Sequence, residues 1–294
     1  MLTYLIPDPK TGKAIEAANH AQMNLCWTCN SCNTECPVNI ATNRLQPLKI
    51  VHMAKLGFMD QLVDLPEIWY CLACNRCNTI CPMTVKPAAV ISYLREQAVR
   101  RKRVSYDTLC RFRDLFARFQ QVRWHMASQC LNGRNTAVTP FQWHQWLETP
   151  VQSAVGNIRY QDLFCGSNAF KTAAVNSKTK FCITCSGCSS ACPVFYKRDV
   201  FDPVWIFRMV NLGLAEDLLK SPAIWLCMAC QRCTNACDQE IKGHLLINRL
   251  QELAVEEGYV DGDFAFRWKK ADQALYPRLL EEIDALFAFK PSNF

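Results

Sequence analysis

Residues 26–37 read CWTCNSCNTECP, so that four cysteines are spaced C-x2-C-x2-C-x3-C and a proline follows the last one. The same spacing recurs in residues 71–81, 182–192 and 227–237. The last cysteine of the second and third motifs is also followed by proline, whereas Asp238 follows that of the fourth. Spacings this regular are typical of metal-binding loops, whereas disulfides need no fixed spacing.

The motif suits a cubane [4Fe–4S] cluster. Three thiolates in one tight loop can bind three of its irons, and in two-cluster ferredoxins the fourth ligand is the last cysteine of the other motif. The four motifs form two pairs that suit this exchange, so we predict four [4Fe–4S] clusters. The first and second quartets are Cys26, Cys29, Cys32 and Cys81, and Cys71, Cys74, Cys77 and Cys36. The third and fourth quartets are Cys182, Cys185, Cys188 and Cys237, and Cys227, Cys230, Cys233 and Cys192.

Structural zinc is the main alternative for these cysteines. Zinc sites usually pair two C-x2-C segments across a longer gap. A third cysteine only three residues further on disfavours a closed tetrahedral site, and the motif occurs four times. We therefore expect iron–sulfur clusters and neither zinc nor a disulfide framework.

The two pairs of motifs belong to an internal repeat. Cys26, Cys71 and Cys81 each lie 156 residues before their counterparts Cys182, Cys227 and Cys237. The match extends outside the motifs, for example from Ile68-Trp69 to Ile224-Trp225. We predict two tandem domains, residues 1–125 and 157–294, joined by a connector of residues 126–156 that has no counterpart and carries turn signals.

The segments between and after the motifs have a helical period. Apolar residues at spacings of three and four follow Pro47 and Pro203, where proline can open a helix, and Pro66 and Pro222 mark helix ends. Further helices are expected at 88–99 and 245–256. Strand signals are nearly absent, so we predict a mainly α fold of two tandem α-helical ferredoxin domains.

Composition narrows the class of protein. Half of the 294 residues are hydrophobic, so the chain can bury sizeable cores. The N-terminal residues lack the apolar core of a secretory signal, and no window is apolar enough for a transmembrane segment. We expect a cytoplasmic protein, whose peripheral association with a membrane would run through another protein of its complex.

The formal net charge of +7 falls on the first half of the chain, and nine Lys and Arg residues against three Asp and Glu gather in residues 95–123. This stretch is either a solvated helix face or a docking surface for an acidic partner protein. Nucleic acid is not an expected partner, because no nucleic-acid-binding motif accompanies the charge.

Several residues stand outside the repeated pattern. Asp238 replaces a proline, which changes the hydrogen bonding of the turn, and its charge would lower the potential of the third cluster unless the residue only faces solvent. Trp69 and Trp225 precede the second motif of each pair and either shield a cluster or pack in the core. The remaining cysteines, which we expect to act as small hydrophobic residues, are Cys110, Cys130 and Cys165.

The paired motifs with helices between them resemble the helical ferredoxin domain of the heterodisulfide reductase C-type proteins, which also occurs in succinate dehydrogenase and glycolate oxidase iron–sulfur subunits. The resemblance covers nearly the whole chain, once per half, whereas family members usually have one such domain. The catalytic B-type subunits and glycolate oxidase iron–sulfur subunits carry Cys-Cys-Gly motifs. This sequence has no Cys-Cys pair, no G-x-G-x-x-G fingerprint and no visible catalytic triad.

The resemblance implies an electron-transfer subunit of an oxidoreductase complex, without an active site of its own. Its partners would be a flavoprotein donor and a heterodisulfide reductase B-like catalytic subunit with Cys-Cys-Gly motifs. The alternative is a stand-alone oxidoreductase in which one cluster has an open iron that binds substrate, with Asp238 as the only hint. A redox-sensing regulator would need a signalling module, which the sequence lacks.

Overall fold

A computed structural model of the chain describes residues 6–133, 139–151 and 177–288, and within these ranges all regular structure is helical. The contacts divide the chain into two compact units. Unit 1 consists of residues 1–114 and 276–294, and unit 2 of residues 115–275. The predicted mainly α fold is confirmed. The units follow spatial contacts whereas the predicted domains follow the sequence repeat, so the boundaries 1–125, 126–156 and 157–294 remain a prediction.

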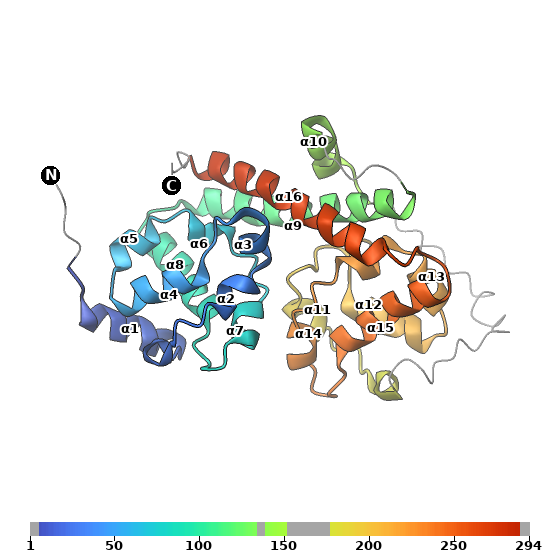
Figure 1. Ribbon diagram of the computed structural model, residues 1–294, viewed down its shortest axis with the longest axis horizontal. Coiled ribbons are helices and arrows are strands. Elements are labelled where there is room, and N and C mark those ends of the chain that lie inside the picture. Colours follow the sequence, from blue (N-terminus) through green and yellow to red (C-terminus); the bar gives the residue numbers. More distant parts are fainter. Residues whose placement is uncertain (1–5, 134–138, 152–176, 289–294) are drawn as a thin grey trace. The chain divides into compact units, whose positions relative to one another are not determined.

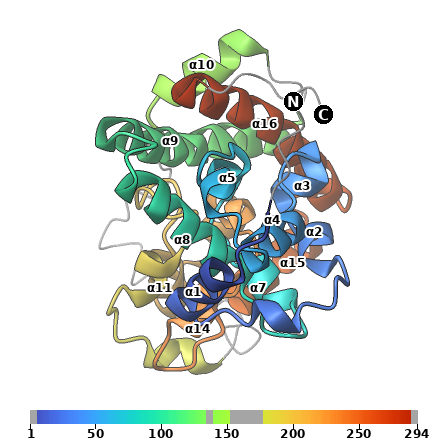
Figure 2. The same cartoon turned by 90° about the vertical axis from the view of Figure 1, so that its left-hand side faces the viewer.

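Unit 1 contains the first pair of motifs (Figure 1). Helices α1, α4 and α8 pack against one another, and α2 packs on α7 (Figure 2). The start of α9 and the end of α16 complete the unit. In chain order its elements are α1 (Pro9–Asn19), η1 (Met23–Leu25), α2 (Ser31–Thr34), α3 (Pro37–Thr42), α4 (Pro47–Lys55), α5 (Met59–Val63), α6 (Glu67–Tyr70), α7 (Arg76–Ile80), α8 (Pro87–Arg100) and the start of α9 (Tyr106–Leu131).

Unit 2 contains the second pair of motifs. Helix α11 packs on α14, and α15 packs on α13, α14 and η6. Its elements after α9 are α10 (Pro140–Glu148), η5 (Ser177–Phe181), α11 (Gly187–Ala191), α12 (Pro203–Asn211), α13 (Ala215–Leu219), η6 (Pro222–Leu226), α14 (Arg232–Asn235), α15 (Gly243–Glu256) and the start of α16 (Phe264–Phe287).

The repeat in sequence is a repeat in structure. Helices α4, α5 and α8 have the same bounds as α12, α13 and α15 when the numbers are shifted by 156. Pro47 and Pro203 are the first residues of their helices, as predicted, because a first-turn proline loses no hydrogen bond. The expected helix up to Pro66 is instead two helices, because Gly57 adopts φ +81° after α4. Gly213 does the same after α12 with φ +78°.

Each unit has an aromatic core that includes the tryptophan before its second motif. In unit 1, Trp69 is buried between Phe112 and Phe287, with ring centroids 5.4 and 4.5 Å away. In unit 2, Trp225 is buried against Phe264, 4.5 Å away. These tryptophans therefore pack in the cores.

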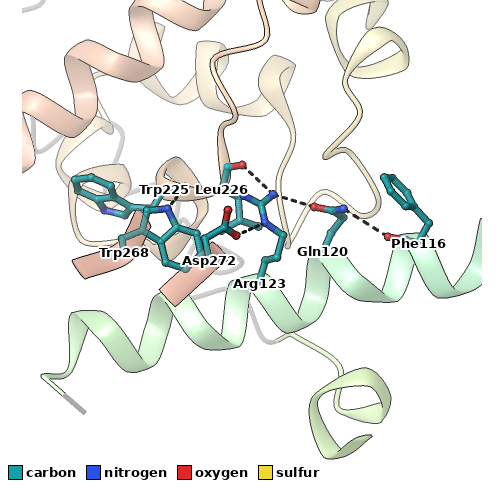
Figure 3. A network of polar contacts seen from close by, with 7 residues as sticks. All are labelled: Phe116, Gln120, Arg123, Trp225, Leu226, Trp268 and Asp272. Atoms are coloured by element: carbon teal, nitrogen blue, oxygen red, sulfur yellow. Dashed lines mark hydrogen bonds and ion pairs between the residues drawn. The ribbon is translucent and has the colours of Figure 1, made fainter. Parts of the chain in front are cut away.

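A buried ion pair joins α9 to α16 inside unit 2 (Figure 3). Arg123 Nε donates to Asp272 Oδ1 at 2.7 Å, and its Nη1 donates to the carbonyl oxygen of Leu226 at 3.1 Å. Trp268 Nε1 donates to the carbonyl oxygen of Trp225 at 2.7 Å. These bonds satisfy the buried backbone directly before Cys227.

Candidate iron–sulfur centres

The four motif loops share one backbone conformation. The residues on either side of the second cysteine have positive φ in every motif, although none is glycine. In the first motif they are Thr28 and Asn30, at +59° and +66°. Such left-handed positions turn successive N–H groups toward one side, which makes the concave, anion-binding backbone found at many iron–sulfur sites. The residues of the other three motifs are Ala73 and Asn75, Thr184 and Ser186, and Ala229 and Gln231.

These strained positions indicate that the loops are shaped for a ligand. A left-handed residue other than glycine costs roughly 1–2 kcal/mol, so eight of them persist only where the surroundings impose the conformation. Backbone N–H groups point at the sulfur atoms, as where Ala73 N donates to Cys71 Sγ at 3.4 Å. Val85 N donates to Cys81 Sγ at 3.5 Å in the same way.

The structure brings together cysteines from paired motifs. One cavity is lined by three cysteines of the first motif together with Cys81 from the second. A second cavity is lined by three cysteines of the third motif together with Cys237, and a third by three cysteines of the fourth motif together with Cys192. Each of these sets is one of the predicted quartets.

The remaining quartet, Cys36, Cys71, Cys74 and Cys77, is buried throughout. Burial raises the pKa of Cys77 far above its ordinary value, and the nearby charges of Cys71, Cys74 and Cys36 raise it further. These thiols are therefore close enough to repel one another as thiolates. In three quartets the last cysteine of one motif lines a cavity with the first three of its partner motif, and in the remaining one Cys36 lies near Cys71 and Cys77.

Thiolates at these sites need a positive counterpart. Burial raises the pKa of Cys32 and Cys36 to about 11, and that of Cys188, Cys192 and Cys227 to about 12. Neighbouring thiolates are a further cause in each case. Iron supplies the positive charge that makes deprotonated thiols stable there.

The donor set fits a cubane better than a single ion. In the described ranges no three His, Cys, Asp or Glu side chains converge closely enough to hold one metal ion. The thiols stand around cavities instead, which suits a cluster that offers a separate iron to each thiolate. All eighteen cysteines in residues 6–133, 139–151 and 177–288 are free thiols. When bound, a [4Fe–4S] cluster supplies one-electron redox chemistry.

Exposure differs between the quartets. Cys29 and Cys185, the second cysteines of the first and third motifs, are exposed, whereas the Cys71 quartet is wholly buried. Apolar side chains beside the exposed loops also face solvent: Trp27 is 70% and Ile183 63% exposed. These two residues occupy the same position of the repeat. The first and third quartets therefore lie nearest the surface of their own units.

Asp238, in the proline position of the fourth motif, lines the cavity of the third quartet and is exposed. The turn of this motif is unchanged by the missing proline. Glu240 N donates to the Cys237 carbonyl oxygen at 3.0 Å, as Thr84 N donates to that of Cys81 at 3.3 Å.

Sequence reasoning missed three polar side chains beside the quartets. His52 Nε2 lies 3.7 Å from Cys26 Sγ. His244 lines the cavity of the fourth quartet, and its Nδ1 lies 2.6 Å from Thr234 Oγ1. Arg95 Nη2 donates to the Cys71 carbonyl oxygen at 2.5 Å. The one signal in the sequence is that each lies three or four residues from apolar residues of a predicted helix, on the helix face that is expected to point toward the motifs.

The other residues set aside in the sequence lie outside the quartets. Cys110 is exposed and Cys130 is buried, and Cys165 falls outside the described residues. Among the basic residues in 95–123, ion pairs are formed by Arg100, Arg101, Arg103, Arg118 and Arg123. Within the part of the chain that the structure describes, no helix is long and apolar enough to cross a membrane.

Two family models match the chain, both described as a 4Fe–4S dicluster domain. One matches residues 25–86 and the other residues 178–241. Each match spans one pair of motifs with the helices between them. The chain therefore carries two 4Fe–4S dicluster domains in tandem, which point to [4Fe–4S] clusters and to electron transfer.

Curated relatives are C-type subunits of archaeal heterodisulfide reductases. The chain is 28% identical over 88 residues to that of the H(2):CoB-CoM heterodisulfide,ferredoxin reductase of Methanothermobacter thermautotrophicus, covering 30% of this chain and 47% of the relative. It is 31% identical over 85 residues to a heterodisulfide reductase C-like protein of Archaeoglobus profundus, covering 29% and 45%. It is 33% identical over 79 residues to the second C-type iron–sulfur protein of the CoB--CoM heterodisulfide reductase of Methanocaldococcus jannaschii, covering 27% and 41%.

These matches span less than half the length of each relative. They confirm the predicted resemblance, since the curated homologues are C-type proteins of heterodisulfide reductases. The chain is thus a tandem 4Fe–4S dicluster protein with curated relatives among the heterodisulfide reductase C-type proteins.

Proposed function

We propose that this chain is an electron-relay subunit that holds four [4Fe–4S] clusters, one in each cysteine quartet. The main support is that, in three of the quartets, the last cysteine of one motif lines a cavity with the first three cysteines of its partner motif. The related C-type proteins support the same function. The residues of this chain bind the clusters, exclude water from them and hold them in fixed places.

In this proposal the electrons come from a flavoprotein-type donor subunit and leave to a heterodisulfide reductase B-like catalytic subunit. The exposed loops around Cys29 and Cys185 are the points at which the first and third quartets come closest to solvent. Electron exchange with partners is fastest where little protein separates donor and acceptor, so these two loops are the proposed entry and exit. The proposal includes a cytoplasmic complex, in agreement with the abundance of reduced thiols.

The cluster count is the first test. Anaerobic reconstitution of the full chain should give about sixteen iron and about sixteen sulfide per chain, four of each per cubane. A fully reconstituted chain that holds about eight irons would refute the four-cluster proposal. The second test is purification of the native complex: a stoichiometric partner with Cys-Cys-Gly motifs supports the relay, and a stable solitary monomer contradicts it.

The second candidate is a stand-alone oxidoreductase with a substrate-binding iron. The exposed Asp238 at the cavity of the third quartet favours it, because this is the one motif without its proline. Spectroscopy separates the two candidates. A site with an open iron changes its electron paramagnetic resonance signal when substrate is added, whereas four fully cysteine-ligated cubanes do not.

A further inference from the structure

A charged residue on α8 distinguishes the second quartet from its counterpart in the repeat. The second quartet (Cys36, Cys71, Cys74 and Cys77) corresponds to the fourth (Cys192, Cys227, Cys230 and Cys233) when the numbers are shifted by 156. The side chain that reaches back from α8 to the second quartet is Arg95. At the same position of α15 the chain has Gln251.

Arg95 is fixed against the backbone of the second motif. Its Nε donates to the carbonyl oxygen of Ile68 at 2.6 Å, and its Nη2 donates to that of Cys71 at 2.5 Å. Its Cζ lies 5.6 Å from the ring centroid of Trp69 and 5.3 Å from that of Phe112. The guanidinium thus lies beside two aromatic rings that contact each other, next to the first ligand of the quartet.

The charge on Arg95 has no carboxylate partner in the described part of the chain, where its polar contacts are the two carbonyl oxygens. Desolvation lowers the pKa of the Arg95 guanidinium, and the charge of Cys71 acts in the opposite direction. An arginine stays protonated in either case. The second quartet therefore has a full positive charge beside it in a half-buried place, where charge interactions are stronger than in bulk water.

Other arginines near the second motif of each pair form ion pairs with carboxylates. Arg44 pairs with Asp284 at 2.8 Å, and both contact the hydroxyl of Tyr70, the residue before Cys71. Arg123 pairs with Asp272 at 2.7 Å and reaches the carbonyl of Leu226, the residue before Cys227. Arg76, inside the second motif, also pairs with Glu35 at 2.6 Å, so Arg95 is the arginine beside the second quartet that has no carboxylate partner in the described residues.

Gln251 shows that one of the two hydrogen bonds made by Arg95 needs no charge. Its Nε2 donates to the carbonyl oxygen of Ile224 at 2.8 Å, as Arg95 does to that of Ile68. The end of η6 is thereby satisfied by a neutral amide. The hydrogen bond to the Ile68 carbonyl therefore does not require the positive charge at position 95.

We propose that Arg95 raises the reduction potential of the cluster at Cys36, Cys71, Cys74 and Cys77 above that of its counterpart at Cys192, Cys227, Cys230 and Cys233. The inference rests on the proposed function. One electron added to a cluster increases its negative charge, and a nearby cation stabilises that reduced form. Arg95 thus makes two quartets of the same sequence pattern unequal, with the electron favoured on the one in unit 1.

The test is a redox titration of the fully reconstituted chain, followed by electron paramagnetic resonance. In Arg95→Gln, which installs the residue of the other repeat, one midpoint should fall. At a fixed potential the ratio of oxidised to reduced cluster at this site should rise about tenfold. That change corresponds to a fall in the midpoint potential of about 59 mV for one electron. Gln251→Arg should raise a different midpoint by a similar amount.

Two further variants separate charge from packing. Arg95→Lys keeps the charge but cannot donate to the Ile68 and Cys71 carbonyl oxygens in the same geometry. The midpoint potential of the second cluster should therefore stay near the wild-type value. Arg100→Gln removes an arginine of the same helix that is exposed and paired with Glu96 at 2.6 Å, and it should move no midpoint.

Unchanged midpoints in an Arg95→Gln variant with wild-type iron content would overturn the inference. If that variant does not hold its cluster, Gln251→Arg decides, and an unmoved midpoint there also overturns it. Failure of the underlying function looks different, because the wild-type chain itself would then fall short of about sixteen irons.

Discussion

At the residue scale, Asp238 shows how one substitution can leave a loop intact and still change its electrostatics. The turn after Cys237 closes as in the second motif, where Pro82 follows Cys81. Proline is therefore not needed to form this turn. What Asp238 adds is a carboxylate on the rim of the third quartet's cavity.

We expect Asp238→Asn to raise the midpoint potential of the third cluster, because it removes a negative charge that opposes reduction. The shift should be smaller than the tenfold change in redox ratio expected at Arg95, since Asp238 is exposed and water screens its charge. Redox titration of the reconstituted chain measures it. Asp238→Pro should give a similar shift, and a shift in Asp238→Pro alone would assign the effect to backbone rigidity instead.

The sixteen motif cysteines were evident in the sequence because their spacing reflects the geometry of the cluster itself. Arg95 and His52 were not, because they act through a backbone carbonyl oxygen and a nearby sulfur atom. Every residue has a carbonyl group, so such a contact leaves no pattern in the sequence. Only the fold decides which helix position faces it.

At the element scale, Gly57 explains why one apolar stripe forms two helices. Gly57 has φ +81° and ends α4, and a Cβ there would lie 1.9 Å from the carbonyl oxygen of Asp8. Gly213 has nearly the same backbone conformation, but a Cβ there would meet no atom within 4 Å. The apolar period runs through both glycines, so it predicts a helix but gives no sign of the break.

The two glycines form a matched pair for a stability measurement. Gly213→Ala should destabilise the protein by about 1–2 kcal/mol, the cost of a left-handed alanine. Gly57→Ala should cost roughly 2–5 kcal/mol, because overpacking against backbone is added. Anaerobic denaturant unfolding of the reconstituted chain measures both. Equal losses would mean that α1 moves aside to admit the methyl group.

Helix α10 packs on α9 through His125, whose pKa is lowered by burial. The His125 ring stacks on Trp146 with centroids 6.0 Å apart, and its Nε2 lies 3.1 Å from the carbonyl oxygen of Thr149. Desolvation lowers the pKa of His125, and the bond to Thr149 only partly opposes this. The unfolded chain therefore binds a proton at a higher pH than the folded chain does.

Because the unfolded chain binds this proton more readily, we expect the protein to lose stability as pH falls from about 6.5, the ordinary pKa of histidine. The loss should continue down to the lowered pKa of His125. Thermal unfolding of the anaerobic holoprotein from about pH 8 to about pH 5 measures the loss. His125→Gln should flatten this part of the profile, because glutamine does not titrate. His144→Gln is the control, and an unchanged slope in His125→Gln would contradict the expectation.

At the scale of the whole molecule, the boundaries of the sequence repeat differ from those of the two compact units. Helices α9 and α16 are equivalents in the repeat, and each begins in one unit and ends in the other. Within unit 1 the end of α16 supplies Asp284 and Phe287 to the residues before Cys71. A sequence repeat cannot reveal this, because an apolar helix face is the same pattern whichever core it covers.

The exchange of fourth ligands between motifs is the prediction on which the whole arrangement depends, and iron counts on double variants can test it. If Cys26 and Cys81 bind the same cluster, Cys26→Ala/Cys81→Ala removes one cluster and leaves about twelve irons. Cys71→Ala/Cys81→Ala then damages two clusters and leaves about eight. Ligation within each motif predicts the reverse order. The matched pairs Cys182→Ala/Cys237→Ala and Cys227→Ala/Cys237→Ala should repeat the result in the second repeat, where Cys237 lines the cavity of Cys182 and not that of Cys227.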